Sequence, residues 1–381
     1  MHNLHICLHD FLYPSRILKE TQSIAKNGIA NRVFIAALHS EGLEEYKDIS
    51  ESVELKRFQL WTRKLSKTFF LQCIKYMEFF IRIFLFYRKK NITMVNVHTL
   101  LLLPLGVILK YTFRAKLIYD AHELDTETVH LKGIKKKFFK FIERLCIKHA
   151  DLIIVVSEPI ADWYAKTYNI PRPIVVLNAP IYKKPLKSNK FREIFKIRED
   201  QKIFLYQGGL SIWATIAVIL EAFKRLKEDT SVMIFMGYGP MEDAIKQATS
   251  CHKNIYFQPP VSMENLATYT SSADFGFIYL GNYDDLCEKF CMPNKLFEYI
   301  MAGIPVITSS NLPSMASFVT QHKVGFVLEN SQLPEAVMDI VKKLEKLNVD
   351  ELKHNALEVA KIYNWEHQEE TMIAAYRQMM A

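Results

Sequence analysis

The chain has 381 residues, half of them hydrophobic, with only 12 glycines and 14 prolines and a formal net charge of +8. This length is too great for one hydrophobic core and suits two domains of ordinary size, while the composition excludes low-complexity and repeat architectures. The moderate positive charge favours acidic ligands or an anionic membrane surface and decides nothing further by itself.

Strand and helix patterns alternate from the N-terminus. Residues 5–9 predict a first strand, followed by a loop at 10–16, a helix at 17–27 and a second strand at 32–37. This strand, helix, strand order predicts a βαβ unit and a parallel sheet.

Residues 62–109 are rich in apolar side chains without predicting a membrane span. Charges interrupt 62–90 too often for a span, and a helix that is apolar nearly all round is either buried or membrane-associated. The uncharged stretch 91–109 contains Asn96, His98 and Pro104, so we predict a strand at 94–98 and then a buried helix.

A polar cluster, Asp120-Ala121-His122-Glu123, ends the next predicted strand. Functional groups of open α/β sheets gather outside the carboxyl ends of strands, so this cluster is a candidate site. The alternative is that His122 is an ordinary core histidine with satisfied hydrogen bonds.

The helix predicted after Gly133 has a basic stripe and an apolar side. The stripe is spaced by four residues, at Lys132, Lys136, Lys140, Arg144 and Lys148, and the apolar side comprises Phe138, Phe141, Ile142 and Leu145. Such a helix suits docking on anionic lipid, and the alternative is a solvated face.

The polar, proline-containing run 183–190 is the predicted domain linker. Beyond it, a strand at 202–206 leads into Gly208-Gly209, where paired glycines let backbone approach a ligand closely. A strand at 231–236 ends in Gly237-Tyr238-Gly239-Pro240, which alone is a weak signal because tight turns use the same residues.

The most informative stretch is Met292–Thr308, MPNKLFEYIMAGIPVIT. Pro293 suits the first turn of a helix, Gly303 ends that helix, and Ile304–Thr308 reads as a buried parallel strand. The helix N-terminus can hold a diphosphate on its backbone, and Glu298, one turn further, is placed to bind a ribose diol. The alternative is an ordinary packed helix before a core strand.

This stretch resembles the donor-binding signature of GT-B, retaining, GT4-like nucleotide-sugar glycosyltransferases, the glycosyltransferase group 1 family. The resemblance implies that Glu298 binds the nucleotide ribose, although Phe290 replaces the glutamate that the family often has eight positions earlier. The run at 120–123 is similar to the family's D-x-H-E/D element, which implies that His122 touches the donor sugar or its phosphate.

The resemblance implies the remaining site residues as well. His122 and Glu298 are the expected catalytic residues, and the acceptor side is expected to use Asp10, Arg16 and Glu123. The expected donor-binding residues are Gly208, Gly209, Gly237, Tyr238, Val261, Asn294, Lys295, Leu296, Phe297 and Glu298.

One departure from the family concerns the phosphates. The family usually has basic residues after the paired glycines, and here Ser211–Thr215 has none. Cations or oriented N–H groups stabilise a leaving diphosphate, so either Lys295 or the backbone is expected to replace them, and without such a replacement activity is abolished or altered. The acidic pair Asp284-Asp285 is predicted to be a solvated loop, because enzymes of this kind need no metal.

We therefore expect an α/β protein of GT-B fold, with two Rossmann-like domains whose parallel sheets face across a cleft. The N-terminal, acceptor-side domain is predicted at 1–182, with the C-terminal helix 365–381 crossing back to it, and the donor-binding domain at 183–364.

The expected activity is transfer of a hexosyl or N-acetylhexosaminyl group from a UDP- or GDP-sugar to a glycan or lipid-linked acceptor, with retention and without a cofactor or metal. The alternatives are a nucleotide-sugar epimerase of GT-B fold and a non-catalytic partner subunit. By resemblance the setting is bacterial surface polysaccharide or glycolipid assembly. Six scattered cysteines without a signal peptide predict a cytoplasmic protein. The basic helix 132–148 is expected to contact the inner face of the plasma membrane. No nucleic-acid partner is expected.

Overall fold

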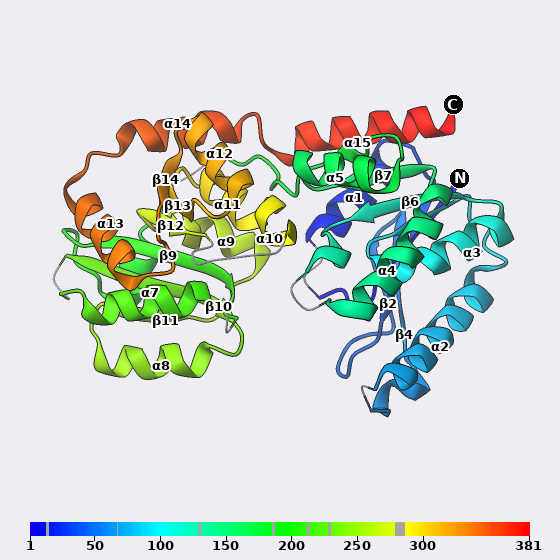
Figure 1. Ribbon diagram of the computed structural model, residues 1–381, viewed down its shortest axis with the longest axis horizontal. Coiled ribbons are helices and arrows are strands. Elements are labelled where there is room, and N and C mark those ends of the chain that lie inside the picture. Colours follow the sequence, from blue (N-terminus) through cyan, green and yellow to red (C-terminus); the bar gives the residue numbers. More distant parts are fainter. Residues whose placement is uncertain are drawn as a thin grey trace. The chain divides into compact units, whose positions relative to one another are not determined.

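The computed structural model describes residues 1–12, 15–66, 68–128, 131–184, 187–211, 214–227, 230–278 and 286–381. The chain divides into two compact units, shown in Figure 1. Unit 1 comprises Met1–Leu177 with Gln368–Ala381, and unit 2 comprises Asn178–His367. The division falls a few residues from the predicted linker, so that 178–182 lie in unit 2.

Unit 1 is built on an eight-stranded sheet in the order β3-β4-β2-β1-β5-β6-β7-β8. All neighbouring strands are parallel except β3 and β4, which are antiparallel. The strands are β1 His2–Ile6, β2 Arg32–Leu38, β3 Tyr46–Ser50, β4 Val53–Phe58, β5 Met94–Val97, β6 Lys116–Ala121, β7 Leu152–Val155 and β8 Ile174–Val175. The α-helices are α1 Ser15–Lys26, α2 Phe69–Tyr87, α3 Leu103–Phe113, α4 Gly133–Cys146, α5 Glu158–Tyr168 and, from Gln368 onward, α15 Trp365–Met380.

Unit 2 is built on a six-stranded, fully parallel sheet in the order β11-β10-β9-β12-β13-β14. The strands are β9 Lys202–Gly209, β10 Ser231–Tyr238, β11 Ile255–Gln258, β12 Phe275–Phe277, β13 Val306–Ser309 and β14 Gly325–Leu328. The α-helices are α6 Lys190–Phe195, α7 Ala214–Arg225, α8 Glu242–Cys251, α9 Met263–Thr270, α10 Leu286–Phe290, α11 Asn294–Met301, α12 Pro313–His322, α13 Pro334–Lys346 and α14 Asp350–Ala360.

The two sheets share one topological feature that positions the sites. In each sheet the first parallel strand lies in the interior, with later strands added first on one side and then on the other. The order of strands therefore reverses beside β1 in unit 1 and beside β9 in unit 2. Ligands of open α/β sheets bind outside the carboxyl ends of strands at such a reversal, so each unit has one expected binding edge.

The hairpin of β3 and β4 was not predicted from the sequence. Strand β3 is largely exposed and carries charged side chains, whereas β4 is buried against β2. The sequence pattern is weak because β3 pairs on one side only and has no apolar face to bury.

The C-terminal helix α15 packs onto unit 1 through polar and aromatic contacts. The hydroxyl of Tyr376 is buried and hydrogen-bonded to the side chain of Asn96, and Asn27 donates to Glu369 at 2.8 Å. Within the described ranges, none of the helices combines the length and apolar character that a membrane crossing requires.

The core of unit 2 leaves no room for a side chain at Gly276 of β12. A Cβ atom there would lie 2.5 Å from Cδ2 of the buried Tyr299, whose hydroxyl is fixed by the backbone N–H of Gln207 at 3.0 Å. We expect Gly276→Ala to lower the free energy of unfolding by roughly 1–3 kcal/mol, measured by urea denaturation. Gly209→Ala is the control, since a Cβ there meets no atom within 4 Å. Equal stability of the two variants would contradict the proposed overpacking.

Candidate active site

In unit 2 the carboxyl ends of β9 and β10 present glycine backbone. Gly208 pairs with Gly237, and Gly209 with Tyr238. Gly208 and Gly237 have φ angles of +116° and +153°, and a Cβ at Gly237 would lie 1.9 Å from the carbonyl oxygen of Gly208. Only glycine fits this close approach. Gly208, Gly209 and Tyr238 are exposed, so the backbone at this edge is open to a ligand.

Helix α11 begins after Pro293 and contributes both buried and half-buried side chains. Leu296 and Phe297 are buried, and Phe297 packs against Phe318 and Tyr363. These two predicted donor-binding residues therefore belong to the core by their side chains. Asn294 and Glu298 are half-buried.

Lys295 is a buried cation at the glycine-lined edge. Its Nζ atom lies 4.0 Å from the ring centroid of Tyr206, and a Cβ atom at Gly208 would lie 3.4 Å from this Nζ. Burial lowers the pKa of Lys295 from 10.5 to about 8, against the raising effect of acidic neighbours led by Glu298. Lys295 thus lies beside Gly208, shortly before the run 211–215 that lacks the family's basic residues. Residues 212 and 213 of this run lie outside the described part of the chain.

The carboxylate of Glu298 is held by a side chain that sequence reasoning missed. Gln207, buried at the end of β9, donates from Nε2 to Glu298 Oε2 at 2.5 Å. Thr270 donates to Gln207 Oε1 at 2.8 Å, so the amide group of Gln207 has one orientation. This bond fixes the direction in which Glu298 presents its carboxylate.

The other predicted residues of unit 2 lie beyond neighbouring strands. Tyr238 ends β10 and is 59% exposed, and Val261 follows β11 and is half-buried. The pair Asp284-Asp285 lies outside the described residues.

In unit 1, Asp120 is the centre of a buried polar cluster at the end of β6. Its carboxylate accepts hydrogen bonds from Arg16 at 2.7 and 3.1 Å, from His98 Nδ1 at 3.0 Å and from His122 Nε2 at 2.6 Å. Burial disfavours the charged form, but Arg16 and the bonds from His122 and His98 hold the pKa of Asp120 well below its usual value. Asp120 is therefore an anion inside the unit.

The guanidinium of Arg16 points inward, away from the expected acceptor contact. It is 4% exposed, and besides Asp120 it bonds the carbonyl oxygen of Val176 at 2.7 Å and lies 2.9 Å from Glu20. Burial and the neighbouring Asp120 nevertheless raise the pKa of Glu20 well above its usual value, because one buried cation does not offset two carboxylates. Arg16 is the counter-charge of Asp120.

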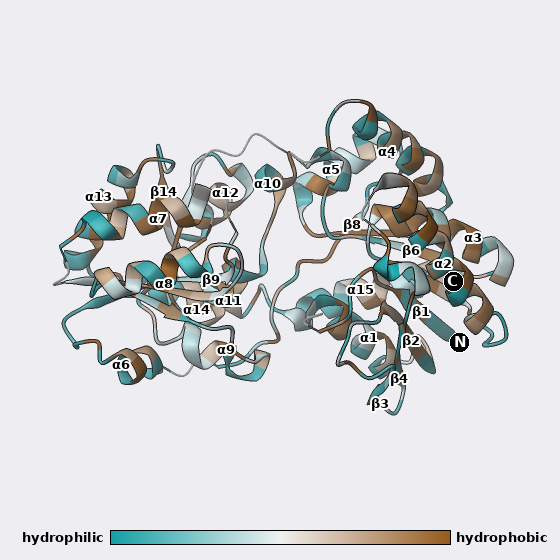
Figure 2. Cartoon of the chain, turned by 90° about the horizontal axis from the view of Figure 1, so that it is seen from below, coloured by the Kyte–Doolittle hydropathy of each residue, from teal (hydrophilic) through white to brown (hydrophobic). Residues whose placement is uncertain are grey.

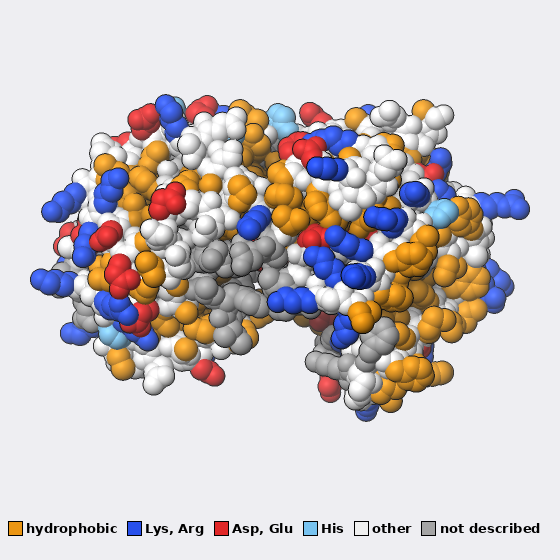
Figure 3. Space-filling view, viewed as in Figure 1, with side chains coloured by type: hydrophobic (Ala, Val, Ile, Leu, Met, Phe, Trp, Pro, Cys, Tyr) orange, Lys and Arg blue, Asp and Glu red, His pale blue; other side chains and the backbone are white. Residues whose placement is uncertain are grey.

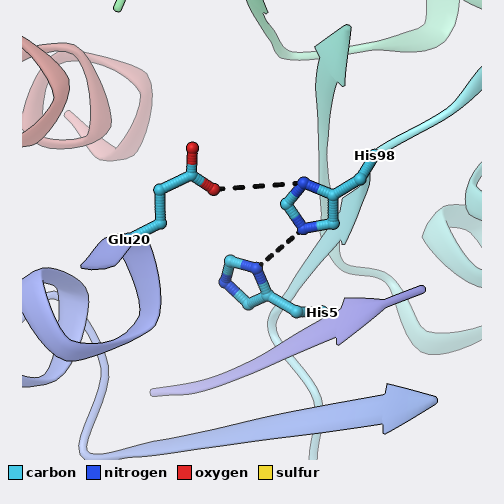
Figure 4. A group of neighbouring side chains, drawn as sticks. All are labelled: His5, Glu20 and His98. Carbon is cyan, nitrogen blue, oxygen red and sulfur yellow. Dashed lines mark hydrogen bonds and ion pairs between the residues drawn. The ribbon is translucent and has the colours of Figure 1, made fainter. Parts of the chain in front are cut away.

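His5 and His98 extend the cluster across β1 and the end of β5. Nδ1 of His5 lies 3.0 Å from Nε2 of His98, and Nδ1 of His98 lies 3.9 Å from Glu20 Oε2 (Figure 4). Burial lowers the pKa of both histidines, that of His98 to about 4, so both are neutral. Because Nδ1–H of His98 donates to Asp120, its Nε2 accepts from His5.

His122 is the half-buried member of this cluster. Its Nε2 is bonded to Asp120, which leaves Nδ1 as the ring nitrogen available to a ligand. The neighbouring Glu123 is exposed, and Asp10 is half-buried, accepting from Ser40 Oγ at 3.0 Å. Of the predicted residues of unit 1, His122, Glu123 and Asp10 are thus reachable from solvent.

Two groups in this cluster have the composition of metal ligands. They are His5, Glu20 and His98, and His98, Asp120 and His122. In both, the ring nitrogens that face one another or Asp120 are engaged in the hydrogen-bond chain, and the Arg16 cation already binds Asp120. A divalent cation would have to displace these protons next to a positive charge, so we interpret the cluster as a hydrogen-bonded network. The expectation that no metal is needed stays a prediction.

Sequence reasoning assigned no role to His98, Glu20 or Gln207. One signal was present in the sequence: polar residues at the ends of otherwise apolar strands, as in His98, Asp120 and Gln207. Carboxyl ends of parallel strands meet at one edge of a sheet, so such residues are candidates for one cluster.

Comparison with protein families gives two matches that follow the division of the chain. Residues 187–362 match the family model described as "Glycosyl transferases group 1", and residues 18–181 match the one described as "Glycosyltransferase Family 4". No curated protein matches the sequence.

Solved structures similar to this chain cover almost all of it. Sucrose-phosphate synthase from Thermosynechococcus elongatus is 16% identical with a TM-score of 0.77, covering 100% of this chain and 99% of its own. HepE of Anabaena, in complex with UDP and glucose, is 13% identical with a TM-score of 0.74, covering 99% and 100%. WaaG, a glycosyltransferase involved in lipopolysaccharide biosynthesis, is 15% identical with a TM-score of 0.69, covering 98% of each chain. At these identities the likeness shows the fold.

Proposed function

Because the chain belongs to the group 1 glycosyltransferases of GT-B fold, we propose that it transfers a sugar from a nucleoside-diphosphate sugar to an acceptor hydroxyl. The observation that carries this proposal is made at the carboxyl ends of β9 and β10 in unit 2. There a buried cation and a hydrogen-bonded carboxylate lie near exposed glycine backbone. Lys295 lies beside Gly208, and Glu298 is fixed by Gln207. Cation, carboxylate and backbone N–H groups are the chemistry that a diphosphate and a ribose require.

Each donor group has a proposed partner. The diphosphate binds the Lys295 ammonium and the backbone of Gly208, Gly209 and the first turn of α11, and the ribose hydroxyls donate to Glu298. The base lies toward Tyr238 and Val261. Structures of HepE in complex with UDP and with UDP-glucose support a uridine donor, with GDP as the other candidate.

His122 is the proposed contact of the transferred sugar, and Asp120 is its positioning residue. Since Nε2–H of His122 donates to Asp120, Nδ1 is the ring nitrogen that remains to contact the sugar. Retention is proposed through front-face attack assisted by the leaving phosphate, which needs positioning and charge stabilisation more than a protein base.

The acceptor is proposed to be a glycan or lipid-linked glycan in bacterial surface polysaccharide or glycolipid assembly. The fold similarity to WaaG, described as acting in lipopolysaccharide biosynthesis, supports this setting. Asp10 and Glu123 are the accessible candidates on the acceptor side. The proposed location is cytoplasmic, peripheral to the inner face of the plasma membrane, and the transferred group is hexosyl or N-acetylhexosaminyl.

Thermal unfolding with UDP, GDP, ADP, TDP and CMP, without added metal, tests the donor site. We expect a shift with one diphosphate, since a ligand at about 100 times its Kd adds roughly 2.7 kcal/mol of stability. Glu298→Ala should lose this shift and Glu351→Ala, which changes an exposed carboxylate of α14, should keep it.

The outcomes separate the proposal from its alternatives. A chain that binds no nucleotide would favour a non-catalytic partner subunit. Conversion of the donor sugar in the absence of any acceptor, followed by product analysis, would favour an epimerase.

A further inference from the structure

Helix α4 turns a polar face toward the rest of unit 1. Glu143 is fully buried and accepts hydrogen bonds from the hydroxyls of Tyr119, Tyr164 and Tyr168, at 3.1, 2.8 and 2.5 Å. Two lysines predicted to form the outer basic stripe, Lys136 and Lys140, bind Glu127 at 2.8 and 2.5 Å. Polar contacts therefore hold α4 to the unit.

The opposite side of α4 exposes an apolar stripe to solvent. Ile134, Phe138, Phe141 and Leu145 are 86, 49, 58 and 54% exposed, and their spacing of four, three and four residues places them on one face. This arrangement is the reverse of an ordinary surface helix, which buries its apolar residues. The stripe is available to a partner.

The apolar surface continues over the two neighbouring helices. Phe84 of α2 stacks on Phe113 of α3 at 5.7 Å, and α3 contacts α4. Figure 2 colours α2 and much of α4 as hydrophobic, and Figure 3 shows hydrophobic side chains gathered where Figure 1 places α2, α3 and α4. Exposed members on α2 and α3 include Phe70, Met77, Ile81, Leu85, Ile108 and Tyr111. We call this surface, with the α4 stripe, the α2–α4 face.

Charges around the α2–α4 face are almost all positive. In residues 61–90, 100–114 and 132–149 the acidic residues are Glu78 and Glu143. Glu143 is buried, and Glu78 accepts from the backbone of Trp61 and Thr62 and from Arg82. Exposed basic residues of these segments include Arg63, Lys64, Arg88, Lys89, Arg114, Lys132, Lys135, Lys137, Arg144 and Lys148.

We propose that the α2–α4 face docks the protein on an anionic bilayer surface. The apolar side chains would enter the boundary between headgroups and acyl chains, and the surrounding Lys and Arg side chains would bind lipid phosphates. A second copy of the chain would set the same positive charges against each other, whereas anionic headgroups neutralise them. Docking is separate from nucleotide binding and does not depend on the proposed donor site.

Vesicle co-sedimentation of the full chain tests this surface, with phosphatidylcholine vesicles with and without phosphatidylglycerol. We expect binding to the anionic vesicles that weakens as salt increases. The double variant Phe138→Gln, Phe141→Gln should bind at least tenfold more weakly. The triple variant Lys135→Gln, Lys137→Gln, Arg144→Gln should lose roughly a hundredfold, about fivefold for each cation.

A matched control removes exposed apolar residues elsewhere. Met263 and Ile362 of unit 2 are 54 and 60% exposed, and the variant Met263→Gln, Ile362→Gln should bind vesicles like the native chain. Far-UV circular dichroism and a thermal unfolding midpoint like those of the native chain would show that the α4 variants are folded. Equal vesicle binding by the native chain and the Phe138, Phe141 variant would overturn the proposal. So would self-association in ultracentrifugation that this variant abolishes, without vesicle binding by the native chain.

Discussion

Replacing Asp120 with asparagine is expected to lower both transferase activity and the stability of unit 1. The variant removes the anion that orients His122, at 2.6 Å, and that neutralises the buried Arg16. Loss of a hydrogen bond to a charged group costs about 1.5–3 kcal/mol, which corresponds to a fall of roughly 10–150-fold in kcat/KM. The variant also breaks the buried pair of Arg16 with Asp120 and leaves Glu20, at 2.9 Å, as the acidic neighbour of Arg16, which adds a loss of about 3–5 kcal/mol in the free energy of unfolding.

Two variants separate the effects on catalysis and on stability. His122→Gln should reduce kcat/KM while leaving the pairing of Arg16 with Asp120 intact. Asp151→Asn is the matched control, because Asp151 pairs with Lys110 at 2.7 Å near the start of β7, away from the carboxyl ends of the strands. It should lower stability without a comparable loss in kcat/KM. Native kcat/KM in a folded Asp120→Asn protein would show that Asp120 does not position His122.

Replacing Lys295 with methionine is expected to reduce kcat/KM by about 10²–10³, the usual loss when one group that stabilises developing negative charge is removed. The ammonium group of Lys295 lies beside Gly208, at the sheet edge where the diphosphate is proposed to bind. Steady-state kinetics with the donor found in the nucleotide panel measures this effect. Lys342→Met, on the exposed side of α13, is the control and should retain native activity.

The same substitution should change how stability depends on pH. Burial lowers the pKa of Lys295 to about 8 in the folded chain, so the charged form is disfavoured there. The free energy of unfolding of the native chain should therefore rise as pH increases from about 8 to 10.5, the pKa of the lysine in the unfolded chain. This difference between the two pKa values corresponds to roughly 3 kcal/mol.

Lys295→Met should lack this rise and should be more stable than the native chain at pH 7, as measured by urea denaturation at pH values across this range. A methionine variant with native kcat/KM would instead assign the diphosphate to the backbone alone.

Local patterns in the sequence were sufficient to predict the fold class. Alternation of apolar strands and amphipathic helices predicted a parallel α/β fold, and the run from Met292 to Thr308 predicted helix α11 followed by strand β13. These features depend on neighbours within one or two turns, which is why they can be read without knowing the rest of the chain. The β3–β4 hairpin was missed because its edge strand buries little apolar surface.

The positioning groups of the candidate sites were decided by tertiary structure. Arg16 and Asp120 are 104 residues apart, and Gln207 and Glu298 are 91 residues apart, so their contacts depend on strand order. Strand order is set by packing of the whole sheet, which no local pattern encodes.

The orientation of helix α4 is a second feature that the sequence pattern alone did not decide. The sequence by itself predicted an amphipathic helix after Gly133, with a basic stripe and an apolar side, and the structure has this helix at Gly133–Cys146. Which side faces inward was decided by the hydroxyls of Tyr119, Tyr164 and Tyr168, which come from β6 and α5 and give Glu143 a buried site. A buried carboxylate needs such partners, and only the folded chain brings them together.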